Sequence, residues 1–150
     1  MDIVRRLKED HEELQAAFTN LMSSEINDPE AYGRSFIDLM IALESHEKAE
    51  ELTIYAQLAS DLDIRPIALQ SLEEHRIARI LMRELADVEM TEEVWIPKLV
   101  VANNLVSLHI QIEEGNVLPI IEQMFDEDAR EKLDRDFDMV HRSTVQQLRS

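Results

Sequence analysis

Apolar residues recur every three or four positions along almost the whole chain, and this spacing constrains the fold more than any other feature. In the first segment Val4, Leu7, Leu14, Phe18 and Leu21 follow it, so they lie on one face of a helix. The 150 residues include only two glycines and four prolines, too few turn formers for a fold with many strands. The pattern therefore predicts an all-α protein.

Breaks in the pattern divide the chain into five predicted helices. New helices are expected after Asp28, which can cap a helix that begins at Pro29, near Pro66, at Thr91 and at Asp126. Four helices over about residues 1–125 would form a bundle, and an additional helix would span about residues 128–149. No low-complexity linker interrupts residues 1–150, so one domain is expected. The additional helix could cap the bundle or mediate a dimer, and capping is favoured.

Charge and composition exclude several classes of function. The chain has 32 acidic and 15 basic side chains and a formal net charge of −17, which repels nucleic acid and anionic membrane surfaces. It has no cysteine, which excludes disulfides and thiol nucleophiles. The first residues do not resemble a signal peptide, and no apolar run approaches the ~18 residues of a spanning helix. We therefore expect a soluble, cytoplasmic protein, with most of its acids on the surface.

The sequence also repeats itself with an offset of 63 or 64 residues. The equivalent positions are His11 and His75, His46 and His109, and Glu50 and Glu113. This repeat predicts two helix pairs that are related by a pseudo-twofold axis and share one core. If the long helices begin near equivalent breaks, the rise of ~1.5 Å per residue places all four histidines at one level of the bundle.

The repeated residues combine into a candidate metal site. In each pair a histidine precedes a glutamate by four residues, which places both on one helix face within the apolar stripe. A single histidine in such a stripe is more often an ordinary core residue, but burying four imidazoles and two carboxylates unpaired is costly. The mixture suits iron or manganese, and six groups are too many for one tetrahedral zinc. Since a carboxylate can bridge two ions, we predict a dinuclear centre with the ligands His11, His46, Glu50, His75, His109 and Glu113.

Four strings together resemble the hemerythrin-like, or HHE cation-binding, family over about residues 5–122: LKEDHEEL, HEKAEELTIYAQL, EEHRIARILMREL and HIQIEEGNVLP. The resemblance implies an up-down-up-down four-helix bundle around two iron ions with an oxo or hydroxo bridge, with manganese or zinc as alternatives. It implies the same six ligands. One departure is Arg79, which stands where oxygen-carrying hemerythrins have a further histidine. This departure weakens the case for reversible oxygen carriage and leaves a position where a small molecule could bind.

The resemblance implies a non-haem di-iron protein, either a monomer or a homodimer, that binds O₂, peroxide or NO, or senses iron, redox state, or oxidative or nitrosative stress. One alternative is a di-iron oxidase or peroxidase, but Tyr55 lies well past Glu50 and its spacing does not tie it to the centre. Another is a metal-free interaction module. Glu47 and Glu114 are candidate supplementary ligands, although a place beyond the ligands or facing solvent fits each better. His141 lies outside the repeat and is expected to be structural or on the surface.

Overall fold

The computed structural model describes all of residues 1–150, and its elements are helical with no strand. The five long helices are α1 (Ile3–Ser23), α2 (Pro29–Leu52), α4 (Arg65–Asp87), α5 (Trp95–Ile112) and α7 (Glu127–Arg149). Two short helices follow α2 and α5, namely α3 (Ile54–Leu58) and α6 (Leu118–Met124), and a π-helical turn, Glu113–Val117, joins α5 to α6. The all-α prediction is confirmed.

The helix starts show how local sequence sets these boundaries. The Asp28 carboxylate accepts hydrogen bonds from the first-turn N–H groups of α2, and Asp126 caps α7 in the same way. Pro66 lies in the first turn of α4, as predicted. The predicted start at Thr91 is wrong, because α5 begins only at Trp95. The segment before Trp95 forms turns instead, one of them closed by the Trp95 N–H on the Glu92 carbonyl.

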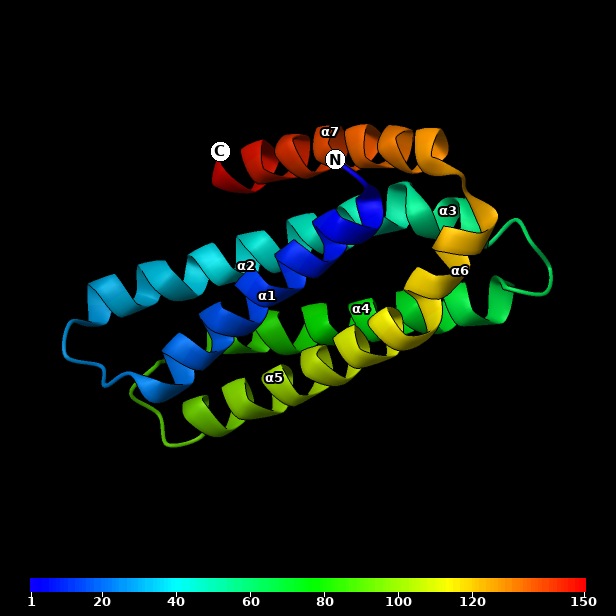
Figure 1. Cartoon of the computed structure of the whole chain (residues 1–150). Coiled ribbons are helices and arrows are strands. Elements are labelled where there is room, and N and C mark those ends of the chain that lie inside the picture. The colour runs from blue at the N-terminus through cyan, green and yellow to red at the C-terminus, as the bar shows by residue number, and fades with distance from the viewer.

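Helices α1, α2, α4 and α5 lie alongside one another (Figure 1). Contacts link α1 to α2 and α5, and link α4 to the same two helices, which is consistent with a helical bundle. One apolar cluster fills the end near the α1–α2 and α4–α5 loops and includes Phe18, Phe36 and Trp95. A second cluster, with Leu7 and Leu118, fills the end near α3 and α6. The two clusters leave a band of buried polar residues between them.

The additional helix lies on the bundle of its own chain. Helix α7 follows α2 (Figure 1) and makes most of its contacts with it. Its Phe137 is fully buried, and Arg149 near its end binds Asp38 of α2 at 3.1 Å. These contacts agree with the predicted capping role. None of the helices is long and apolar enough to cross a membrane.

Candidate metal centre

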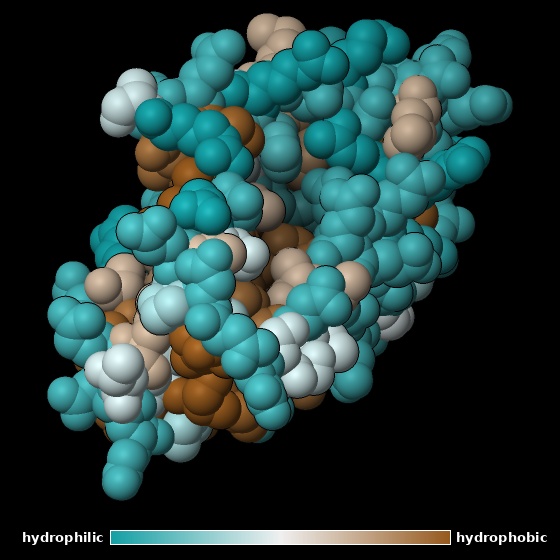
Figure 2. All heavy atoms as spheres, turned by 90° about the vertical axis from the view of Figure 1, so that its left-hand side faces the viewer, coloured by the Kyte–Doolittle hydropathy of each residue, from teal (hydrophilic) through white to brown (hydrophobic).

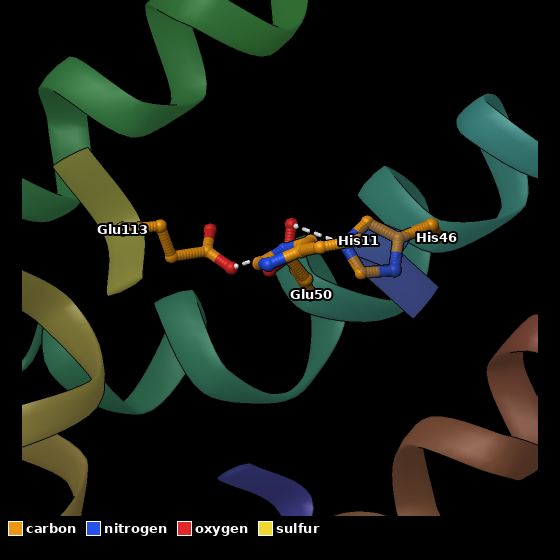
Figure 3. A group of neighbouring side chains, drawn as sticks. All are labelled: His11, His46, Glu50 and Glu113. Carbon is orange, nitrogen blue, oxygen red and sulfur yellow. Dashed lines mark ion pairs between the residues drawn. The ribbon is translucent and has the colours of Figure 1, made fainter. Parts of the chain in front are cut away.

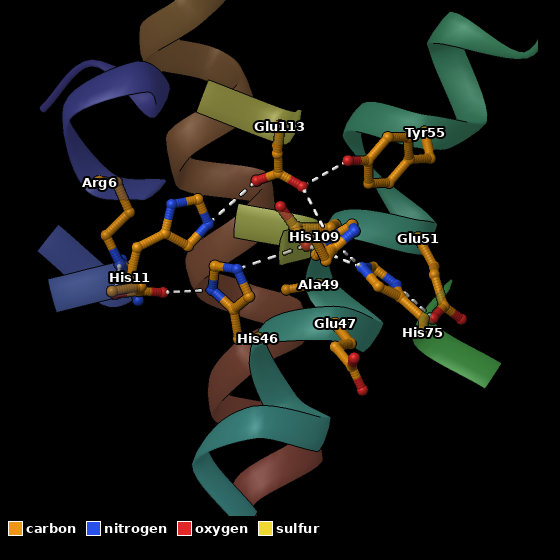
Figure 4. A network of polar contacts seen from close by, with 12 residues as sticks. Arg6, His11, His46, Glu47, Ala49, Glu51, Tyr55, His75, His109 and Glu113 are labelled. Carbon is orange, nitrogen blue, oxygen red and sulfur yellow. Dashed lines mark hydrogen bonds and ion pairs between the residues drawn. The ribbon is translucent and has the colours of Figure 1, made fainter. Parts of the chain in front are cut away.

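The six predicted ligands are all buried, and they meet in the polar band between the two apolar clusters. Helices α1 and α4 each supply one histidine, α2 and α5 each supply another, and the glutamates come from α2 and from the π-helical turn (Figure 4). The π-helical turn begins at Glu113. The change from α-helix to π-helix after α5 therefore occurs at a predicted ligand.

The six side chains form two groups that share both carboxylates. His11 and His46 belong to the first group (Figure 3), and His75 and His109 belong to the second. Glu50 and Glu113 are members of both groups. Within each group the potential ligand atoms lie within 4.8 Å of one another. Each group therefore offers two imidazoles and two shared carboxylates.

All four rings turn Nε2 towards the glutamates. In the first group, His11 Nε2 lies 3.1 Å from Glu113 Oε1, and His46 Nε2 lies 3.4 Å from Glu50 Oε1. In the second, His75 Nε2 lies 3.2 Å from Glu50 Oε1, and His109 Nε2 lies 3.3 Å from Glu113 Oε2. The His75 and His109 Nε2 atoms are 3.1 Å apart.

Several of these inward atoms are buried without a hydrogen-bond partner. They are His11 Nε2, both Glu50 carboxylate oxygens and Glu113 Oε1. An unsatisfied buried polar atom costs about 1–3 kcal/mol, and more when it is charged. Imidazole nitrogen and carboxylate oxygen are ligands for iron, manganese and zinc. The residues therefore fit a pair of metal ions at the centre.

The outward Nδ1 atom of each of these four histidines faces a further carboxylate. The pairs are His11 with Glu114 at 2.6 Å, His46 with Asp10 at 2.9 Å, His75 with Glu51 at 3.0 Å, and His109 with Glu74 at 2.6 Å. Such contacts hold the ring orientation and leave Nε2 free to bind a metal. The same pattern occurs in both helix pairs, since Asp10 and Glu74 precede a histidine and Glu51 and Glu114 follow a glutamate.

We expected most acids to be ordinary surface charge, but these four carboxylates are partly buried and contact the histidines. Glu114 does lie beyond the ligands, in one of the two places expected for it, but Asp10, Glu51 and Glu74 were not predicted to contact histidines. The sequence did contain a signal for these contacts, because each of the four carboxylates is adjacent to a predicted ligand and has an equivalent acid in the repeat.

The carboxylates also change the pKa values of the histidines. Burial lowers the pKa of His75, but the neighbouring carboxylates of Glu50 and Glu51 outweigh it and raise this pKa to about 9. Burial also opposes the charged form of His109, whereas Glu113 and Glu74 raise its pKa to about 10. A metal ion that binds these Nε2 atoms must displace any proton they carry.

Tyr55 is a functional candidate that its sequence spacing did not reveal. Its buried hydroxyl donates a hydrogen bond to Glu113 Oε2 (Figure 4). The chain ends α2 at Leu52 and restarts as α3 at Ile54, and this break directs Tyr55 towards the centre. The equivalent position in the repeat is Leu118, which has no hydroxyl, so this contact belongs to only one half of the molecule.

Arg79 and Glu47 also lie on the side of His75 and His109. The Arg79 guanidinium donates a hydrogen bond to Glu51, and its Nε lies 3.7 Å from Glu47 Oε1. Glu47 is buried rather than solvent-facing, and burial raises its pKa to about 7 although His75 and Arg79 oppose that rise. Arg79 thus places one positive charge beside two carboxylates around the centre.

Two hollows reach the candidate centre. A cavity of about 10 Å³, about the size of one water molecule, is lined by all four histidines, by Glu47 and by apolar side chains such as Leu43. A groove of about 910 Å³ between α1 and α2 reaches Asp10 and His46. In Figure 2 the end of the molecule that carries the α1–α2 and α4–α5 loops is hollowed, with apolar atoms inside hydrophilic rims.

His141 borders the groove, where it stacks on Phe137 and contacts no carboxylate, in agreement with a structural role.

Comparisons with known proteins give one match. A family model described as the hemerythrin HHE cation-binding domain matches residues 2–121, which include all six predicted ligands and end before α7. No curated protein and no solved structure matched the chain.

Proposed function

Because the chain belongs to the hemerythrin HHE cation-binding family, we propose that its buried cluster holds two iron ions and binds O₂ or another small ligand. The observation that carries this proposal is the membership of Glu50 and Glu113 in both ligand groups. Two separate mononuclear sites would not need shared carboxylates, whereas a dinuclear centre does. Manganese and zinc remain alternative metals for the same donors.

The architecture proposed with this function is an up-down-up-down four-helix bundle with a pseudo-twofold axis, in one domain that spans residues 1–150. In support, the α1–α2 and α4–α5 loops lie at the same end of the molecule (Figure 1). The two sets of histidine–carboxylate contacts are also equivalent between the helix pairs.

Bound iron would supply electrons and open coordination positions for O₂, peroxide or NO. The chain's own residues supply the rest: the outer carboxylates orient the four rings, and Glu50 and Glu113 would offer a carboxylate to the ions in both ligand groups. The cavity beside the histidines favours a ligand of two or three atoms over an organic substrate, because its volume is only about 10 Å³. A sensor of oxygen, redox state or nitrosative stress would use the same small-ligand chemistry.

Elemental analysis tests the metal proposal most directly. Protein purified without added metal, and again after anaerobic reconstitution with ferrous iron, is expected to hold about two iron ions per chain. The matched control is His141→Ala, which removes a histidine outside the cluster and should leave the metal content unchanged. Less than about half an equivalent of any transition metal after reconstitution would favour a metal-free interaction module instead.

Addition of O₂ or NO to the anaerobic ferrous protein tests ligand binding. The optical spectrum is expected to change with each gas, and Glu113→Ala should abolish the change. An unchanged spectrum with every ligand contradicts the small-ligand proposal even if two iron ions are bound.

The Tyr55 hydroxyl on Glu113 favours a second candidate, a di-iron oxidase or peroxidase, because a phenol beside the centre is an oxidisable group. Sustained consumption of peroxide or ferrous iron, lost in Tyr55→Phe, would support the enzyme. A single stoichiometric reaction with no turnover would support binding or sensing.

A further inference from the structure

The outer face of α5 differs from the face of α2 that is equivalent to it in the repeat. On α2 this face is covered by α7, and Asp38 binds Arg149 of α7. Ile41 and Ser45 continue the same face in steps of three and then four residues, and they are 8% and 0% exposed. Adding the offset of 63 residues gives Val101, Asn104 and Leu108 on α5. No helix covers these residues, and Val101 and Leu108 are 54% and 52% exposed.

The exposed face of α5 has the spacing of a helix–helix seam. Its positions alternate in steps of three and four residues and are Val94, Pro97, Val101, Asn104, Leu108 and Gln111. This average period of 3.5 residues is typical of helices that pair along their length. The apolar members of this face, Val94, Val101 and Leu108, are about half exposed, although apolar positions at this spacing normally face a neighbouring helix.

This face also lacks charge in a chain where 31% of the residues are charged. Between Trp95 and Ile112 the only Asp, Glu, Lys or Arg is Lys98, and its ammonium group is held by Glu84 of α4 at 3.2 Å. Ile77 and Ile80 on α4 are also exposed and add apolar surface. Glu84 faces α5, since it binds Lys98, and Ile77 lies two helical turns before Glu84 on the same side of α4.

We propose that this α5 face binds a second copy of the chain, with the two α5 helices antiparallel across a twofold axis near Asn104. Two chains of net charge −17 repel each other, and a face without acids, such as this one, is where that repulsion opposes association least. Antiparallel pairing about this axis places Val101 of each copy opposite Leu108 of the partner subunit. The contact is therefore self-complementary, as a twofold interface must be. The second α5 covers this face as α7 covers α2.

Sedimentation velocity over about 5–200 μM protein tests the proposal, since association depends on concentration. The dimer mass is expected for the unaltered chain, and Val101→Glu with Leu108→Glu should weaken dimerisation at least about 100-fold, because like charges then face each other. Met139→Glu with Leu148→Glu is the matched control, since it adds two charges at exposed apolar positions of α7 and should leave the dimer intact. Circular dichroism checks that each variant folds.

Disulfide trapping tests the geometry, because the chain has no cysteine of its own. Asn104→Cys lies beside the proposed axis and should crosslink under mild oxidation, whereas Met139→Cys should not. A monomer at every concentration, a dimer that survives the two glutamate substitutions, or equal crosslinking at both positions would overturn the proposal. None of these measurements depends on bound iron, so they remain informative if the proposed function fails.

Discussion

The two halves of the candidate metal centre share their ligands and differ in their surroundings. Each half has two histidines, the same two glutamates, and an outer carboxylate on each ring. Beside His11 and His46, however, Phe137 of α7 approaches the His46 ring at 5.7 Å, and Arg6 lies over Phe137 while binding Asp10. The half with His75 and His109 has no helix equivalent to α7.

That second half instead carries three polar residues that have no counterpart in the repeat. Tyr55 binds Glu113, Arg79 binds Glu51, and Glu47 is buried beside Arg79. The equivalent positions of Tyr55 and Glu47 are Leu118 and Ile110. Duplicated residues thus build two similar groups of candidate ligands, and the residues that are not duplicated make the two groups chemically unequal.

The shared carboxylates provide the most severe test of this comparison. Glu113→Ala removes a ligand from both halves at once, so iron content is expected to fall from about two to below about half an equivalent. Inductively coupled plasma mass spectrometry measures it, and Glu92→Ala, at an exposed acid, is the control. Retention of two iron ions would show that Glu113 is not a shared ligand.

Substitution of one histidine separates the halves. His46→Ala and His109→Ala each remove one imidazole from one half, so about one iron ion per chain is expected in each variant, because the other half keeps its four donors. The same elemental analysis applies. Loss of both ions in either variant would show that the two halves do not bind their ions independently.

The outer carboxylates provide a weaker, matched pair of changes. Asp10→Asn and Glu74→Gln alter equivalent positions and are each expected to lower iron affinity about 10–100-fold, because His46 and His109 lose their charged Nδ1 partners. Competition with a chelator measures the affinity. Substitution of an exposed acid such as Glu93→Gln should have no effect.

The pH dependence of stability probes the half with His75 and His109 in the metal-free protein. Folding raises the pKa of these rings from the ordinary 6.5 to about 9 and about 10. The protonated rings therefore contribute stability that is fully present below about pH 6.5 and is lost as the pH rises through 9 and 10. Thermal unfolding should show the midpoint falling over this range. The iron-loaded protein should depend less on pH, and the same slope in both forms would contradict the assignment.

Tyr55→Phe is expected to have the smallest effect. It removes one hydroxyl from Glu113, so the unfolding free energy should fall by about 1 kcal/mol while iron content stays the same. Denaturant unfolding of the metal-free protein measures the change. Tyr32→Phe is a matched control, since its hydroxyl donates to the Leu21 carbonyl at 2.6 Å in the apolar cluster away from the centre. A change in reduction potential in Tyr55→Phe alone would show that the phenol acts on the centre and not only on stability.

The sequence alone predicted the five long helices and named the six candidate ligands. Helical period and caps depend on residues within a few positions of one another, which is why the starts at Asp28 and Asp126 agree with the structure. The four-residue spacing of His46 with Glu50 and of His109 with Glu113 is equally local, and the repeat related one pair to the other. The start of α5 was misplaced because the competing turns before Trp95 contain the same polar residues that open helices.

Only the tertiary structure decided which groups meet across helices. The outer carboxylate on each of the four histidines and the Tyr55 contact with Glu113 join residues that are far apart in sequence. The same is true of α7, which covers α2 and leaves the equivalent face of α5 exposed. A sequence pattern can show which face of a helix is apolar, but which neighbour covers that face depends on the packing of the whole chain.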